Sequence, residues 1–420
     1  MQKRFVAFLI AVLVAAGAGL ATAQERFGGL TGIVTDASGA VLPGATVTIT
    51  SKTTGAARTI VTSGDGLYNV ADLEPGRYSM VVELNGFAKV SMDDVMVSLG
   101  KTLKVDAQLK VGDLSEVVQV QAEARPAIDT RSTLVSHNIT AEEIDRLPKG
   151  RSFQSLAMTA PSVNSGEIEG GFQVNGASGA ENAFTVDGVV TNSLINGSSR
   201  QNTVFEYLQE VQVKTTGIAA EYGGALGGVI SAVTKSGGNT FRGEGHYLYE
   251  GSGLSAGPVK RLVLDPVDDL TVTYQQDTKA PDNRNEIGGS IGGPIVKDKL
   301  FFYGSFSPRF ATRTNSYNYS NGTEHGDIKR DQKLMQLFGK VTYSGSRITA
   351  SGSALFTPTT SEGTLPAYNG SGENSITSSL AANQPNVTRG FEQTQTNTSG
   401  NVDVVGVKSA EPEAVKRLLL

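Results

Sequence analysis

The sequence predicts a mainly β protein with three parts: a small N-terminal β-sandwich, an α+β domain, and an incomplete antiparallel transmembrane β-barrel. Three observations predict this fold class. Glycine accounts for 50 of 420 residues and aromatic residues for 7%, which suits turn-rich β-structure. Apolar residues alternate with polar ones over long stretches, as in half-buried strands. The length exceeds what one ordinary core supports, so two or three domains are expected.

Residues 1–23 have the features of a signal peptide. Lys3-Arg4 is a short basic region, residues 5–20 form an uncharged apolar run, and residues 21–23 read Ala-Thr-Ala, a small-residue cleavage site. The run is short for a membrane-spanning helix, although a spanning anchor is the alternative. We therefore expect an exported protein.

Charge and composition exclude several classes of function. The net charge of −5 argues against a nucleic-acid partner. The chain has no cysteine and only three histidines, which argues against zinc sites, catalytic thiols and disulfides. We expect no cofactor, no metal site and no catalytic residue.

Residues 24–112 alternate short strand signals with turns such as Pro43-Gly44 and Pro75-Gly76. In the strand-like run 45–50, Val47 and Ile49 share one face. About seven such strands, with turns every 8–12 residues, indicate a small sandwich. Residues 113–130 form a connector that contains an apolar patch at 115–122. The alternative interpretation is that this patch is one more strand of the sandwich.

Residues 131–238 mix helix and strand signals. Thr140 and Glu143 form a capping box, residues 151–158 predict a short amphipathic helix, and residues 172–176, 184–188 and 207–214 predict strands. Residues 221–238 hold three glycine pairs around a β-branched run. Glycine weakens a strand unless another backbone approaches closely or the chain bends, so we expect crowding there; a plain glycine-rich turn is the alternative.

Residues 239–404 alternate at period two, and no charge occurs on the apolar face. A lipid-facing wall requires this, because a charge at the midplane costs about 2–4 kcal/mol. Long polar connections (250–284, 311–332, 357–391) also alternate with short turns (296–299, 344–346), as in transmembrane barrels. A soluble sandwich is the alternative. The apolar-face positions are Phe241, Gly243, Gly245, Tyr247, Tyr249, Ile287, Gly289, Ile291, Gly293, Ile295, Phe302, Gly304, Phe306, Phe310, Met335, Leu337, Gly339, Val341, Tyr343, Ile348, Ala350, Gly352, Ala354 and Phe356.

With these segments, the chain resembles TonB-dependent outer-membrane receptors of the Oar-like type, which carry an N-terminal carboxypeptidase-regulatory-like domain. The resemblance covers about residues 28–400. The sandwich motifs are GIVTD (32–36), LPGATV (42–47), GDGLY (64–68) and LEPGRY (73–78); the plug motifs are FTVDGV (184–189), VQVK (211–214), EYGGALGGVI (221–230) and VTKSG (233–237); the barrel motifs are GGPI (292–295) and KDKLFFYG (297–304).

The resemblance makes residues 131–238 a plug domain inside the barrel, with the glycine pairs letting its backbone lie close to neighbouring strands and the barrel wall. It also implies a TonB box, an extended segment that pairs with TonB as an added strand. In the connector, Glu116, Val117, Val118 and Val120 are the candidates. The plug-motif residues are Asp187, Gly188, Tyr222, Gly223, Gly224, Gly227 and Gly228.

The implied setting is the outer membrane of a Gram-negative bacterium, with sandwich and plug on the periplasmic side or inside the barrel. The implied partners are TonB and its inner-membrane energising complex, outer-membrane lipid, and an unidentified extracellular solute such as an oligosaccharide or a peptide. The activity would be energised uptake of that solute. A surface binding or adhesion protein, whose sandwich binds carbohydrate or protein, is the alternative.

Two features depart from the family. A receptor barrel of about 22 strands needs about 220 membrane residues, more than follow Asn239, where we expect about five or six strands. Residues 405–420 also lose the alternation. We therefore expect a truncated chain with an atypical tail, unable to insert or transport alone because open sheet edges are costly in lipid.

Two motifs could suggest an enzyme. Gly253, Ser255 and Gly257 match the G-x-S-x-G pattern of a nucleophile elbow, but that motif needs a strand before it and a helix after it, and a polar loop and Pro258 are expected there. His246 and Glu250 are four residues apart without an H-E-x-x-H motif, and we expect them to line the barrel lumen.

Overall fold

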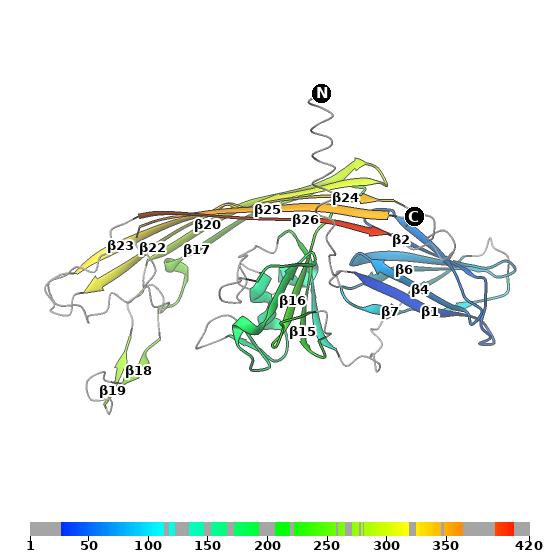
Figure 1. Cartoon of the computed structure of the whole chain (residues 1–420), viewed down its shortest axis with the longest axis horizontal. Helices are drawn as coiled ribbons and strands as arrows, with labels where there is room; N and C mark the ends of the chain where they lie inside the picture. The colour runs from blue at the N-terminus through cyan, green and yellow to red at the C-terminus, as the bar shows by residue number, and fades with distance from the viewer. Residues whose placement is uncertain are drawn as a thin grey trace, which may run out of the picture. The chain divides into compact units, whose positions relative to one another are not determined.

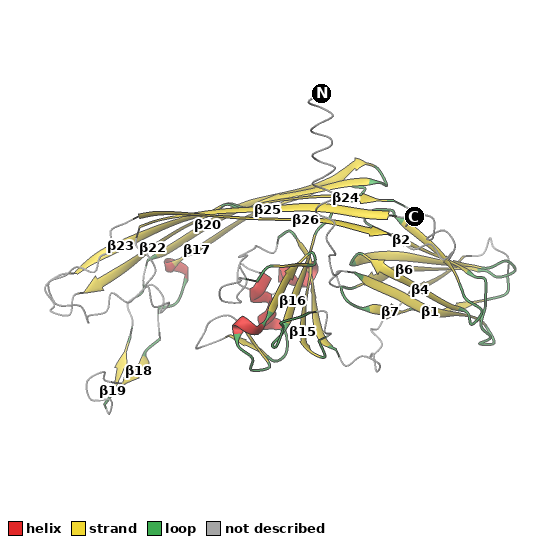
Figure 2. Cartoon of the chain, viewed as in Figure 1, coloured by secondary structure: helices red, strands yellow, loops and turns green. Residues whose placement is uncertain are grey.

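A computed structural model of the chain confirms the mainly β fold class. Figure 1 shows the strands, and Figure 2 shows that helical segments are few. The chain divides into two compact units. The first is Met1–Lys235 with the short stretches Gly345–Ile348 and Val405–Leu420, and the second is Ser236–Ser344 with Thr349–Val404. No helix among the described residues is long and apolar enough to cross a membrane. The structure describes residues 27–112, 117–121, 134–146, 153–165, 172–192, 206–218, 222–257, 259–264, 271–276, 279, 281–318, 325–345, 348–363 and 391–406. The expected signal peptide and residues 407–420 lie outside these ranges.

The N-terminal domain is a sandwich of two sheets. One has the order β4-β1-β7 with β8 beside β1, and the other has the order β3-β2-β5-β6-β9. Alternation builds the core, since Val47 and Ile49 of β2 are both buried as their spacing predicted. The strands are β1 (Gly28–Asp36), β2 (Thr46–Ser51), β3 (Ala57–Val61), β4 (Leu67–Leu73), β5 (Gly76–Glu83), β6 (Lys89–Val97), β7 (Thr102–Lys104), β8 (Ala107–Leu109) and β9 (Val117–Gln121).

A buried tyrosine of β4 is bonded to the link between β7 and β8 in the same sheet. The Tyr68 hydroxyl donates a hydrogen bond to the Val105 carbonyl at 2.6 Å, which satisfies the one polar group that this ring brings into the core. Burial raises the pKa of the Tyr68 phenol. A side chain at Gly32 would meet the same Val105 carbonyl, so the close approach of these two backbone segments requires glycine.

The plug domain has one five-stranded sheet of order β10-β15-β16-β13-β14. Helix α2 (Ala141–Arg146) begins with the predicted capping box, since the Thr140 N–H donates to the Glu143 carboxylate at 2.8 Å. The strands are β10 (Val135–Thr140), β13 (Ala183–Val186), β14 (Val189–Val190), β15 (Leu208–Thr216) and β16 (Val229–Thr234), beside a hairpin of β11 (Val163–Ser165) and β12 (Phe172–Val174).

The helix expected over residues 151–158 is instead a 3-10 segment, η1 (Phe153–Thr159). Its buried residues include Phe153 and Leu156, whose spacing of three fits three residues per turn better than 3.6. The Phe153 ring meets Phe184 of β13 edge to face, with ring centroids 6.4 Å apart.

The second unit contains an antiparallel sheet of eight strands. Its order is β17-β20-β21-β24-β25-β23-β22, with β26 beside β25 and an additional β20–β22 pairing (Figure 1). Within the described residues the sheet is open. Its strands are β17 (Arg242–Gly251), β20 (Asp282–Val296), β21 (Leu300–Phe306), β22 (Arg309–Asn318), β23 (His325–Leu334), β24 (Leu337–Ser344), β25 (Ile348–Gly363) and β26 (Phe391–Gly406).

The strand count agrees with the expected five or six. In the pairing registers β22 continues β21 along β20, and β23 continues β24 along β25, so the eight segments form six continuous strands. The expected position of one loop is corrected. Residues 311–332 were expected to be a loop, but β22 and β23 pair over ten register positions, from Arg309 with Leu334 to Asn318 with His325. Backbone pairing continues there although the polar sequence gives no alternation to detect. A small hairpin, β18 (Arg261–Leu264) with β19 (Val272–Gln275), likewise lies inside the expected loop 250–284.

The apolar face predicted for this sheet is exposed. In β20, Ile287, Ile291 and Ile295 are 54–56% exposed. On the opposite face of the same strand, Glu286 and Gly292 are buried. The same pattern holds for Phe241, Tyr247, Tyr249, Phe306, Phe310, Leu337, Val341, Tyr343 and Phe356, all exposed. These isoleucines and aromatic residues do not form a central core, and an exposed apolar face of this extent is typical of a surface that contacts lipid.

Candidate functional site

The candidate TonB-box residues Val117, Val118 and Val120 lie on β9, while Glu116 lies outside the described residues. Strand β9 runs parallel to β6, with Lys89 opposite Val117 and Asp93 opposite Gln121. The connector patch is therefore a strand of the sandwich sheet. Within the described part of the chain β9 is the last strand of that sheet, so one of its edges has no neighbouring strand.

In the plug, Asp187 and Gly188 form the two-residue turn between β13 and β14. Both have positive φ, 48° and 80°, as a type I′ hairpin turn requires. The Asp187 carboxylate is 4% exposed and accepts two hydrogen bonds from Thr234, from the backbone N–H at 2.9 Å and from the hydroxyl at 2.5 Å. Asp187 therefore fixes this turn to the end of β16.

The second glycine pair, Gly227-Gly228, is crowded by the plug itself. A Cβ on Gly227 would lie 2.6 Å from the Asn182 side-chain oxygen, and one on Gly228 would lie 2.7 Å from a Val174 methyl group. The Gly228 N–H donates to the same Asn182 oxygen at 2.8 Å. By contrast, Gly223 has open space around it. Close approach thus explains the second pair of glycines.

Within the same segment, Gly224 has φ +84° and forms part of a turn. Next to it, Tyr222 is buried against Lys214 of β15. The Lys214 ammonium donates to the Tyr222 hydroxyl at 2.5 Å and lies 4.2 Å from the ring centroid. A cation over an aromatic face is stabilised further when it is desolvated, and Lys214 is buried. Tyr222 thereby ties the glycine-rich segment to the centre of the plug sheet.

Sequence reasoning missed a contact between the sandwich and the plug. The turn after β6 inserts Leu99, whose side chain is fully buried. Its backbone N–H donates to both oxygens of the Glu210 carboxylate, at 3.2 and 3.1 Å. Its carbonyl accepts from Asn138 at 2.9 Å and from Gln212 at 2.7 Å. We call these three plug side chains, Glu210, Asn138 and Gln212, the Leu99 socket.

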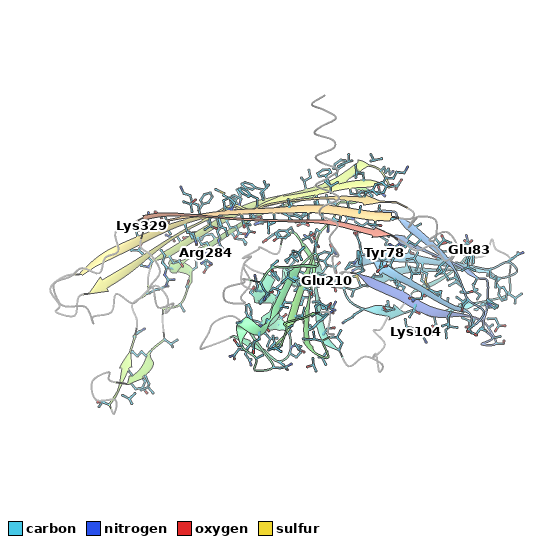
Figure 3. All side chains as sticks on the ribbon, in the orientation of Figure 1. Tyr78, Glu83, Lys104, Glu210, Arg284 and Lys329 are labelled. Atoms are coloured by element: carbon cyan, nitrogen blue, oxygen red, sulfur yellow. The ribbon has the colours of Figure 1, made fainter. Side chains whose placement is uncertain are left out.

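The Leu99 socket is a buried polar network. Glu210, labelled in Figure 3, is 3% exposed and also accepts from Asn138 at 2.7 Å. Burial raises the pKa of the Glu210 carboxyl, and the hydrogen bonds from Asn138 and Leu99 oppose that shift. At the rim, Arg77 of the sandwich meets Glu142 of the plug at 3.1 Å. No sequence signal connects Leu99 with residues more than a hundred positions away.

The structure gives ordinary partners to the motifs that could suggest an enzyme. The Ser255 hydroxyl donates to the Gly251 carbonyl at 3.2 Å. Strand β17 does precede Ser255, separated from it by one 3-10 turn, Ser252–Leu254. In the described residues the next element after Ser255 is strand β18 and not a helix, so the strand–turn–helix context of a nucleophile elbow is missing there. On the barrel sheet, Glu250 pairs with Arg284 at 2.6 Å.

Three domain families match the chain in sequence order. Residues 29–110 match the carboxypeptidase regulatory-like domain, residues 129–229 match the TonB-dependent receptor plug domain, and residues 233–406 match an outer membrane beta barrel domain. A TonB-dependent transporter, Oar from Myxococcus xanthus, is 32% identical over 297 residues. This chain belongs to the TonB-dependent receptors. Its plug and barrel domains indicate the outer membrane of a Gram-negative bacterium.

The matched region is 68% of this chain and 27% of Oar, so this TonB-dependent receptor chain spans about a quarter of that relative. Among solved structures, the chain is similar to the outer membrane transporter YddB from Escherichia coli. The two are 19% identical with a TM-score of 0.43, and the match covers 54% of this chain and 33% of YddB. Another is a mutant of the ferric enterobactin receptor PfeA from Pseudomonas aeruginosa, 16% identical with a TM-score of 0.39, covering 64% of this chain and 46% of PfeA.

Proposed function

We propose that this TonB-dependent receptor chain takes part in the energised uptake of an extracellular solute across the outer membrane. The observation that carries the proposal is the order of regulatory-like domain, plug and barrel in one chain, together with a relative described as a TonB-dependent transporter. In this function the energy comes from the inner membrane through TonB, and the chain itself performs no catalysis.

The proposal assigns a role to each part of the chain. Strand β9 pairs with TonB, since an extended strand with a free edge is what strand addition needs. The Asp187 anchor and the crowded Gly227-Gly228 pair keep the plug compact. The barrel sheet contacts lipid through its exposed apolar face. The solute is unidentified, and oligosaccharides and peptides are the classes we would test first.

The test compares three strains: one with the complete receptor gene, one without it, and one without TonB. Each grows on a mixture of oligosaccharides and peptides, and mass spectrometry follows depletion of each compound from the medium. We expect at least one compound to be depleted only when receptor and TonB are both present, and a protonophore to stop its depletion. Surface binding that is indifferent to TonB and to the protonophore would contradict uptake and favour an adhesion role.

A further inference from the structure

Strand β9 is held by the sandwich in a defined register. Val118 lies opposite Val90 and Val120 lies opposite Met92, and Val90 and Met92 are buried in the sandwich core. The pairing is parallel and ends opposite Asp93. Strand β9 is thus kept extended by β6, with its other edge free of any described strand.

Strand β6 also leads directly into the plug. It ends at Val97, and two residues later Leu99 enters the Leu99 socket, where both its N–H and its carbonyl are bonded by plug side chains. Gly100 has φ +64°, and a Cβ there would lie 2.8 Å from the Gln212 side-chain oxygen, so both the backbone conformation and the close approach favour glycine in this turn. The strand that holds β9 is therefore anchored on β10 and β15 of the plug.

We propose that the sandwich domain presents β9 to TonB: β6 keeps the segment extended, the Leu99 socket fixes the sandwich on the plug, and a strand from the periplasmic domain of TonB adds to the free edge of β9. This inference rests on the proposed function. It differs from a sandwich that merely covers the TonB-pairing segment, which TonB would have to pull away from β6 before binding.

The two arrangements predict different effects on TonB affinity when β9 is locked on β6. A presented strand is already ordered, so TonB does not meet the entropic cost of fixing its backbone. Fixing the backbone of a single residue corresponds to about tenfold in affinity. Locking β9 on β6 therefore leaves the affinity for TonB almost unchanged if β9 is already presented, and lowers it if β9 is covered.

The chain has no cysteine, so an introduced pair can form only one disulfide. Ser91 of β6 and Gln119 of β9 are register partners, and paired strands lie about 4.8 Å apart, within the Cα separation that a disulfide spans. Ser91→Cys with Gln119→Cys locks β9 on β6. The matched control is Thr48→Cys with Thr59→Cys, register partners in β2 and β3 whose hydroxyls are 3.2 Å apart. Affinity of the purified receptor for the TonB periplasmic domain is measured for each oxidised and reduced form.

We expect the oxidised Ser91–Gln119 pair to bind TonB within about twofold of its reduced form, as the control pair does, and Ser91→Pro to weaken binding at least tenfold by disrupting β6. A tenfold loss on oxidation, restored by reduction and absent from the control, would overturn presentation. No binding by any form would overturn it too. In that case, TonB-dependent depletion in cells would leave the proposed function standing with its pairing strand elsewhere, whereas TonB-independent depletion would contradict both.

Discussion

Replacing Glu210 with alanine should loosen the contact between sandwich and plug. The change removes the acceptor of the Leu99 N–H and one acceptor of Asn138. A hydrogen bond to a charged group contributes about 1.5–3 kcal/mol, and an unpaired buried N–H costs about 1–3 kcal/mol. Burial of the carboxylate opposes these gains, as its raised pKa indicates. We expect a net loss of about 2 kcal/mol in the free energy that keeps the Leu99 socket closed.

Hydrogen exchange of the Leu99 amide measures this loss directly, because that N–H exchanges when the socket opens. A loss of about 2 kcal/mol corresponds to about thirtyfold faster exchange. Glu210→Gln keeps one acceptor oxygen and should show a smaller increase. Glu83→Ala, which removes an exposed carboxylate paired with Lys89 in the sandwich, is the control and should leave Leu99 unchanged. If Glu210→Ala exchanges within twofold of the unaltered receptor, the socket does not hold the domains together.

The same carboxyl gives a pH dependence of definite sign. Because the pKa of Glu210 in the docked state is raised above its ordinary value of 4.5, the docked state binds more protons than the open state between those two values. Docking therefore weakens as pH rises through that window. After correction for intrinsic exchange rates, Leu99 should be better protected near the lower end of the window, and Glu210→Gln should abolish the difference. Protection that increases with pH would contradict the raised pKa.

Three further predictions concern the plug and its exit. Gly237→Ala would place the new Cβ 2.2 Å from the Phe302 carbonyl oxygen, and this overlap should destabilise the protein by about 3 kcal/mol. The expected result is a lower melting temperature of the barrel sheet. An unchanged melting temperature would contradict the close approach. Asp187→Ala removes the carboxylate that accepts from the buried Thr234 N–H and hydroxyl and should cost about 1–3 kcal/mol. Faster proteolysis of the plug would show this loss, and unchanged proteolysis would contradict it. Tyr222→Phe removes the hydroxyl beside the buried ammonium and should destabilise the plug by about 1–2 kcal/mol in chemical unfolding, whereas an unaltered midpoint would show that the hydroxyl does not matter.

Most of the fold could be predicted because alternation reports burial on one face of a strand. It succeeded for β2, whose Val47 and Ile49 are buried, and for β20, whose isoleucines are exposed on the apolar face. It failed for β22 and β23, which are paired through their backbones over ten positions but carry mostly polar residues. Pattern reading detects contrast between faces, and these two strands offer none.

The Leu99 socket could not be predicted for a related reason. Along β15, Glu210, Gln212 and Lys214 alternate with Val211 and Val213, which predicts one face in water. In the structure both faces of β15 are buried. The polar face contacts Leu99 and Tyr222 instead of solvent. A sequence shows which residues are polar, but it does not show which backbone groups from another domain will pair with them.

The central claim is that alternate side chains of the barrel sheet contact lipid in the outer membrane. Single cysteines at Ile287, Ile291 and Ile295, compared with Ser290 and Ser305, can carry nitroxide labels in the receptor as the cell makes it. We predict that labels at the three isoleucine positions collide with lipid-soluble oxygen and are shielded from a water-soluble nickel complex, with the opposite preference at the serines. Isoleucine-site labels that are equally open to the nickel complex would show that this face meets water, and the assignment to a membrane wall would be wrong.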